Sequence, residues 1–178
     1  PEEIVRTVKA IAPNFGGINL EDIAAPACFE VERRLIEELD IPVMHDDQHG
    51  TAIVVLAGLI NAAKVVKKDL KKLIVVVSGA GAAGTAVTKL LLQAGITDIQ
   101  VLDRGGVINT ARRDLNDAKK ELAKITNPRD VSGGLSEALA GADVFIGVSG
   151  KGLLTAKQVG TMAANAIVFA LANPVPEI

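Results

Sequence analysis

Short runs of β-branched residues alternate with helical stretches from residue 73 to the end of the chain. Four strands are predicted, at residues 73–77, 99–102, 144–148 and 166–171. Four helices are predicted between these strands, at residues 83–93, 110–124, 135–140 and 155–162. Continuous apolar strands separated by helices are typical of a parallel sheet covered on both faces, so we predict a doubly wound α/β fold. A further strand is expected before Gly133, and whether residues 127–132 form it is left open.

Helical periodicity dominates the first part of the chain. Apolar residues recur every four positions at Ala27, Val31, Leu35 and Leu39. This spacing predicts an amphipathic helix over residues 25–39, and the apolar run 52–66 predicts a mostly buried helix. We expect a helical lead segment over residues 1–70, packed on a core formed by residues 71–178.

A glycine-rich loop follows the first of the four predicted strands. The loop has the sequence GxGxxG, formed by Gly79, Ala80, Gly81, Ala82, Ala83 and Gly84. In such a loop the first glycine permits a tight turn, the second lets the backbone approach a pyrophosphate, and the third lets helix and strand pack closely. Asp103 ends the next strand, where a carboxylate can accept hydrogen bonds from an adenosine ribose. The order of strand, loop, helix, strand and acid predicts a Rossmann-like dinucleotide-binding core. The alternative is a compact turn with Asp103 capping the loop after it.

Three further positions bear on the cofactor. Asp103 repels a 2′-phosphate and favours NAD, whereas Arg104 beside it softens that preference and keeps NADP open. Ser149 and Asn173 each follow a predicted strand, and ligands in such sheets bind outside the carboxyl ends of the strands. Plain turn chemistry is an equal alternative for Ser149.

Four carboxylates lie at two turns of the lead segment. Glu21 and Asp22 precede the first predicted helix, and Asp46 and Asp47 precede the second. Oxygen-only ligands suit Mg²⁺ or Mn²⁺. On the pattern alone, acids that interact with helix dipoles are the more common explanation.

His45 and His49 have the spacing of a zinc-binding HExxH motif, but the segment stands at a helix entrance. That motif needs both imidazoles on an established helical face, so we expect solvated loop histidines instead of a zinc hydrolase. Cys28 is expected to be a small buried hydrophobe.

Composition narrows the class of protein. The chain has 178 residues, 49% of them hydrophobic, which suffices for one good core. A net charge of -2 leaves no basic excess, so neither nucleic-acid binding nor polybasic membrane attachment is expected. The longest apolar run is too short to span a bilayer, and a single Cys fits a reducing cytoplasm.

The chain begins without Met, so we expect a piece of a longer protein. It contains no Tyr, so a phenol acting as general acid must come from elsewhere.

Three motifs together are more specific than the glycine loop. They are GINLED at residues 17–22, APACFE at 25–30 and HDDQHGTA at 45–52. With the SGAGAAG loop at 78–84 and FALANP at 169–174, these motifs closely resemble the shorter bacterial malic enzymes, and the resemblance covers essentially the whole chain.

The resemblance implies roles for particular residues. Glu21, Asp22 and Asp47 resemble the divalent-metal ligands, and Asp46 resembles the acid that supports the catalytic lysine. Asn173 matches the asparagine that contacts substrate and nicotinamide. The family's catalytic Tyr and Lys lie upstream of the part that this chain resembles.

The resemblance implies oxidative decarboxylation of L-malate to pyruvate and CO₂, with reduction of NAD or NADP, in a homodimer. We expect this chain alone to be inactive, because it lacks the catalytic Tyr and Lys. The alternatives are a non-catalytic dinucleotide-binding or sensing module, and a malolactic or oxaloacetate-decarboxylating relative.

Overall fold

The computed structural model describes residues 1–178, and its larger part is built on a five-stranded sheet. The strands are β3 (Ile74–Ser78), β4 (Asp98–Asp103), β5 (Gly106–Val107), β6 (Val144–Gly147) and β7 (Ile167–Ala170). Their spatial order is β5-β4-β3-β6-β7, and every pair is parallel except β4 with β5. After β4 the chain crosses back to β6 on the other side of β3, which places a topological switch point at the carboxyl end of β3. The predicted doubly wound α/β fold is confirmed.

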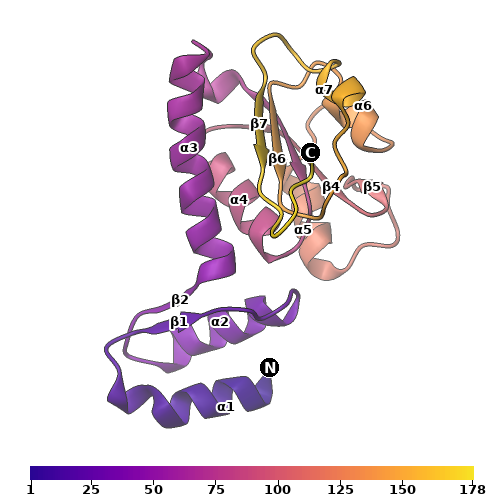
Figure 1. Cartoon of the computed structure of the whole chain (residues 1–178). Coiled ribbons are helices and arrows are strands. Elements are labelled where there is room, and N and C mark those ends of the chain that lie inside the picture. The colour runs from indigo at the N-terminus through magenta and orange to yellow at the C-terminus, as the bar shows by residue number, and fades with distance from the viewer.

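Helices cover both faces of this sheet, as Figure 1 shows. The helices are α3 (Thr51–Val65), α4 (Ala82–Gln93), α5 (Asp117–Ile125), α6 (Leu135–Leu139) and α7 (Ala156–Val159). The first three share one hydrophobic cluster with the sheet, and the last two pack on the other side. Val75 and Val77 belong to the first cluster and Val76 to the second, because successive side chains of a strand point to opposite faces.

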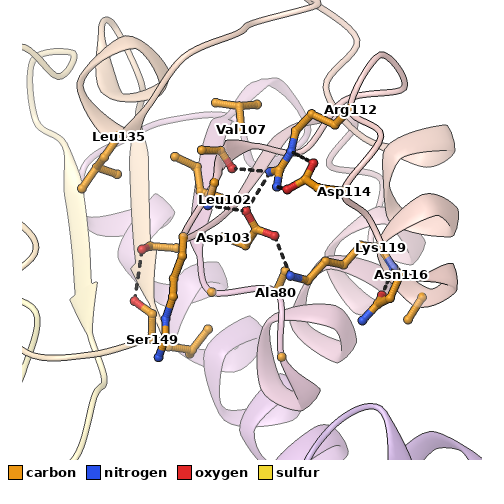
Figure 2. Close-up of a pocket in the computed structure, with 18 of the residues that line it drawn as sticks. Ala80, Leu102, Asp103, Val107, Arg112, Asp114, Asn116, Lys119, Leu135 and Ser149 are labelled. Atoms are coloured by element: carbon orange, nitrogen blue, oxygen red, sulfur yellow. Dashed lines mark hydrogen bonds and ion pairs between the residues drawn. The ribbon is translucent and has the colours of Figure 1, made fainter.

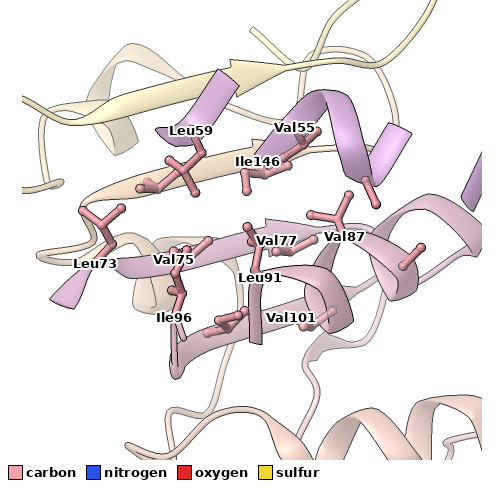
Figure 3. Close-up of a cluster of buried hydrophobic side chains, with 14 of the residues drawn as sticks. Val55, Leu59, Leu73, Val75, Val77, Val87, Leu91, Ile96, Val101 and Ile146 are labelled. Carbon is pink, nitrogen blue, oxygen red and sulfur yellow. The ribbon is translucent and has the colours of Figure 1, made fainter. Parts of the chain in front are cut away.

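The larger cluster is the main core of the molecule. In Figure 3, Leu59 of α3 and Leu91 of α4 lie over Val75, Val77 and Ile146 of the central strands. All of these side chains are fully buried. Burying a residue of this size stabilises the fold by about 1.5–3 kcal/mol, so this layer holds β3 and its glycine loop in place.

The N-terminal part has a small core of its own. It contains α1 (Glu2–Ile11), α2 (Ala27–Glu38) and the parallel strands β1 (Ile18–Leu20) and β2 (Val43–His45). Val5, Leu20, Val31 and Leu35 form its buried centre. Figure 1 shows this part at one end of α3, which runs from it along the sheet. Helix α3 lies within residues 1–70 but packs in the larger core. The predicted division of the chain into two parts after residue 70 stays a prediction.

Most predicted elements appear within a few residues of their expected bounds, but the helix expected at 110–124 begins late. Helix α5 starts at Asp117, where the Asn116 side chain accepts a hydrogen bond from the Lys119 N–H at 3.0 Å. The preceding residues form a loop in which the Asn109 side chain accepts from the N–H of Ala111. Local side-chain bonds of this kind compete with the helix.

Residues 127–132 contain no strand. Asn127 has a φ of +57°, and its side chain binds both the N–H and the C=O of Val131. The sheet ends instead at the antiparallel strand β5. Neither β5 nor helix α1 was expected from the sequence.

Candidate functional site

The glycine loop leads from β3 into α4 with very little space for side chains. Gly79 has a φ of +120°, and a Cβ there would lie 2.7 Å from the carbonyl oxygen of Val148. A Cβ on Gly84 would lie 1.7 Å from the carbonyl oxygen of Gly79. Gly81 has no neighbouring atom within 4 Å of a Cβ position, so its backbone faces open space at the start of α4. The geometry of Gly79 and Gly84 agrees with the tight turn and the close packing predicted for them, and the approach of a pyrophosphate to Gly81 stays a prediction.

A cleft of about 1260 Å³ opens at the carboxyl ends of β3, β4 and β6 (Figure 2). Its lining includes the predicted cofactor residues Gly79, Ala80, Gly81, Asp103, Arg104 and Ser149. Ala25, Pro26 and Phe29 line it as well, so the start of α2 also faces the cleft. Because the cleft lies at the switch point of the sheet, it is the place where a doubly wound fold binds its ligand.

Asp103 lies in this cleft between two cations. Arg112 Nη1 binds its Oδ1 at 2.7 Å, Lys119 Nζ binds its Oδ2, and the N–H of Gly105 donates to Oδ1 at 2.9 Å. Burial on its own raises the pKa of Asp103, but the hydrogen bonds from Arg112 and Lys119 outweigh it and lower the pKa to about 2. Asp103 is therefore an anion at neutral pH whose charge is largely compensated.

Sequence reasoning missed Arg112 and Lys119. They stand 9 and 16 positions beyond Asp103, and no motif marks them. Figure 2 shows both side chains pointing at the Asp103 carboxylate. Arg112 also pairs with Asp114. Its hydrogen bonds to Asp114 and to Asp103 raise the pKa of its guanidinium. Arg104 lines the cleft on the exposed side and does not pair with Asp103.

A second cavity of about 470 Å³ lies beyond the ends of β6 and β7. Ala83 and Asn173, which are absent from the lining of the cleft, line this cavity together with Lys151. Val148 and Ser149 line both spaces, and the Oγ of Ser149 lies 3.1 Å from the Oγ of Ser78. Ser149 therefore stands where the cleft and the second cavity meet. Ala82 and Gly84, which were also predicted to bind the cofactor, line neither the cleft nor the cavity.

The structure brings the two acidic turns of the lead segment together. The N–H of Asp22, which has a φ of +57°, donates to Oδ2 of Asp47 at 2.8 Å. Glu21 and Asp22 precede the first turn of α2, so they are not acids of that helix start. No three His, Cys, Asp or Glu side chains are arranged to hold a metal ion, and the predicted Mg²⁺ or Mn²⁺ site stays a prediction.

Asp46 and Asp47 begin a single π-helical turn, η2 (Asp46–Gly50), that leads into α3. This turn packs against α4, the helix that carries the glycine loop. A Cβ on Gly50 would lie 2.3 Å from Oδ1 of Asp46, so a side chain at this position would displace that carboxylate from its place over the turn. Asp46 and Asp47 thus lie on a turn beside the helix that follows the glycine loop.

The expectation of solvated loop histidines is wrong for His45. Its ring is fully buried, neither ring nitrogen has a hydrogen-bond partner, and Nε2 lies 3.8 Å from Oδ2 of Asp47. His49 is half exposed, with Nε2 2.7 Å from Oε1 of Glu32. The buried Glu32 also accepts from the N–H of His45 and from Nε2 of Gln48. The two imidazoles have different environments, which disfavours a shared zinc ion.

Cys28 is fully buried on α2, and burial raises the pKa of its thiol. A buried neutral thiol is a poor nucleophile. The prediction that Cys28 acts as a small hydrophobe is confirmed.

The switch-point cleft, the glycine loop and the acid after the second strand define a dinucleotide-binding domain of the Rossmann type. Comparison with known families identifies it further. The NAD binding domain of malic enzyme matches residues 48–178, and the malic enzyme N-terminal domain matches residues 1–36. The chain therefore belongs to the malic enzyme family, as its motifs predicted, and it carries an NAD(P)-binding domain.

Individual relatives agree with the family assignment. An NAD-dependent malic enzyme of Geobacillus stearothermophilus is 59% identical over 99% of this chain and 37% of its own length. An NADP-dependent malic enzyme of Halomonas elongata is 50% identical over 100% of this chain and 42% of its own length. The crystal structure of the NAD-dependent malic enzyme from Thermotoga maritima matches 99% of this chain and 48% of that chain, with 49% identity and a TM-score of 0.95. This chain thus spans less than half the length of each of these relatives.

None of the helices combines the length and the apolar character needed to cross a membrane.

Proposed function

We propose that this chain is the cofactor- and metal-binding part of an enzyme that converts L-malate to pyruvate and CO₂ with reduction of NAD or NADP. The observation that carries the proposal is the pairing of two sites. The glycine loop and Asp103 line one cleft, and the Asp22–Asp47 contact places both acidic turns beside the helix of that loop. A decarboxylating dehydrogenase needs a hydride acceptor and an electrophile close together.

The cofactor proposal assigns the pyrophosphate to the glycine loop and the adenosine ribose to Asp103. Gly81 lets the pyrophosphate approach the backbone N–H groups at the start of α4, where the helix dipole favours an anion. We propose NAD as the preferred form, because Asp103 remains ionised and repels a 2′-phosphate. Arg112 and Lys119 offset part of that repulsion, so NADPH binds more weakly but still binds.

The metal proposal assigns Mg²⁺ or Mn²⁺ to Glu21, Asp22 and Asp47. The donor set fits a hard cation, since all three residues supply carboxylate oxygens, and the hydrogen bond from the Asp22 N–H to Asp47 joins the two acidic turns. When bound, the metal polarises the C2 oxygen of malate and the nicotinamide accepts the hydride.

The remaining residues position the substrate. Asn173 lines the cavity at the end of β7, and its amide is proposed to contact both substrate and nicotinamide. Asp46 is proposed to hold the catalytic lysine in place. The chain contains no Tyr, so the phenol that protonates the enol is missing from these residues, and we propose that the chain alone does not turn over malate.

The first experiment is a fluorescence titration of the chain with NADH and with NADPH, each with and without Mn²⁺. The absence of Trp and Tyr removes the usual protein background. Saturable enhancement by NADH with weaker binding of NADPH supports the proposal. No response to either nucleotide would contradict it.

The metal site is tested by Mn²⁺ binding, measured by electron paramagnetic resonance in Asp47→Asn and in Asp40→Asn. Asp40 is an exposed carboxylate outside the proposed site and serves as the matched control. We expect the Asp47 variant alone to lose affinity. Equal affinity in both variants would remove Asp47 from the metal site.

Activity separates this function from its alternatives. Malate-dependent NADH production by these residues alone would contradict the role given to the missing tyrosine. In the longer protein, pyruvate as the product supports a malic enzyme, and lactate supports a malolactic enzyme. We also propose that the longer protein is a homodimer, which analytical ultracentrifugation tests. We propose a reducing compartment such as the cytoplasm, because the one cysteine is a free thiol.

A further inference from the structure

Glu177 is a fully buried carboxylate near the C-terminal end of the chain. Its Oε1 accepts a hydrogen bond from the N–H of Ser149 at 3.0 Å, and its Oε2 accepts one from the N–H of Ala172 at 3.0 Å. One side chain therefore joins the segment that follows β6 to the segment that follows β7. Nothing in the sequence motifs predicted this contact.

The two segments need such a link because the sheet has ended between them. The last ladder pair of β6 and β7 is Gly147 with Ala170, and the last backbone bond runs from the N–H of Leu171 to the C=O of Gly147 at 3.0 Å. Beyond that point the N–H groups of Ser149 and Ala172 have a carboxylate as acceptor in place of a neighbouring strand. A hydrogen bond to an ionised acceptor is about twice as strong as a neutral one.

The surrounding backbone is shaped to admit this carboxylate. A Cβ on Gly147 would lie 2.3 Å from Cδ of Glu177, so a side chain at the end of β6 would displace this carboxylate. The C=O of Glu177 accepts from the N–H of Leu154, and the C=O of Pro176 accepts from the N–H of Gly152. The last residues of the chain are thus held across the strand ends on both sides of the carboxylate.

The joined segments carry the residues at the far end of the dinucleotide site. Ser149 stands between the cleft and the second cavity, and Asn173 lines that cavity directly after Ala172. Loss of the carboxylate would remove the link between the Ser149 and Asn173 segments, whereas Asp103 would keep its bonds to Arg112 and Lys119. The adenosine end of the site depends on β3, β4 and α5, which Glu177 does not contact through these bonds.

We propose that Glu177 is a positioning residue that fixes the nicotinamide end of the cofactor site by holding the ends of β6 and β7 at a set spacing. The inference rests on the proposed binding of NAD(P) in this cleft. It assigns to Glu177 an effect on the nicotinamide half of the cofactor and none on the adenosine half.

The test compares two ligands in the Glu177→Gln variant by isothermal titration calorimetry. NADH spans both halves of the site, whereas ADP-ribose lacks the nicotinamide. Gln has the shape of Glu but only one acceptor oxygen, so one of the two N–H groups then faces an NH₂ donor. We expect NADH affinity to fall about tenfold and ADP-ribose affinity to change less than about twofold.

Glu121→Gln is the matched control, because Glu121 is an exposed carboxylate of α5 that pairs only with Lys124. It should bind both ligands like the parent chain. An NMR spectrum reports the local effect directly: the amide proton signals of Ser149 and Ala172 should shift in Glu177→Gln and stay in place in the control.

A second variant approaches the same contact from the other side. Gly147→Ala keeps the carboxylate but displaces it, so it should show the same selective loss of NADH affinity. The effects of the two substitutions should be less than additive, since both remove one interaction.

The outcomes are distinct. Unchanged NADH affinity in Glu177→Gln overturns the inference and leaves the proposed function intact. Equal losses for NADH and ADP-ribose also overturn it, because they indicate a general effect on the fold. Failure of the parent chain to bind either ligand refutes the proposed cofactor site, and the inference with it.

Discussion

The compensated charge of Asp103 makes a quantitative prediction about stability. The side chain is 11% exposed, so its ion pairs with Arg112 and Lys119 are only weakly screened by solvent. Lowering its pKa from 3.8 to about 2 corresponds to about 2 kcal/mol, because one pKa unit is worth about 1.36 kcal/mol. Asp103→Asn should therefore destabilise the chain by about 2 kcal/mol at pH 7, or by about 4–8 °C in Tm for a chain of this size.

The pH dependence of this destabilisation shows whether the charge of Asp103 causes it. A carboxyl group whose folded-state pKa is lowered stabilises the fold above its unfolded-state pKa, and that stabilisation is lost as the pH falls through the folded-state pKa. The difference between the parent chain and Asp103→Asn should be constant above about pH 5 and should shrink progressively as the pH falls to about 2 and below. Because carboxylates that do not share a partner with Asp103 titrate equally in both proteins, the difference reports on the Asp103 cluster.

The assay is urea unfolding of the parent chain, Asp103→Asn and the control Glu121→Gln at several pH values between 2 and 7. The control should stay within about 0.5 kcal/mol of the parent, as expected for an exposed ion pair. A destabilisation of Asp103→Asn that does not change between pH 5 and pH 2 would refute the reasoning, because it would show that the effect comes from packing and not from charge.

Three further substitutions test the core and the cleft. Gly84→Ala places a Cβ where the Gly79 carbonyl stands, so it should abolish NADH binding and lower Tm, whereas an unchanged titration would contradict the close packing of the loop. Leu59→Ala opens a cavity in the main core and should cost about 2–5 kcal/mol in urea unfolding; a loss below about 1 kcal/mol would mean that α3 is not packed as described. Arg112→Gln removes one cation beside Asp103 and should weaken NADPH binding several-fold more than NADH binding in the fluorescence titration, while equal losses would remove Arg112 from the 2′-phosphate region.

The sequence alone determined the features that depend on local pattern. The alternation of β-branched runs and helices gave the doubly wound sheet, because period and burial are read from neighbouring residues. The glycine loop was also local, since three fixed spacings specify one turn between β3 and α4. Helix α5 began later than predicted because the cap at Asn116 depends on a loop conformation that apolar periodicity does not describe.

Only the tertiary structure decided which distant charges meet. The loop before α5 brings Arg112 to Asp103, the first turn of α5 brings Lys119 to it, and the C-terminal segment brings Glu177 to the strand ends. The contact between Asp22 and Asp47 and the burial of His45 likewise depend on how the lead segment packs against α4. Such contacts join positions 9 to 28 residues apart, and their energies depend on burial and distance, which a linear pattern of residues does not contain.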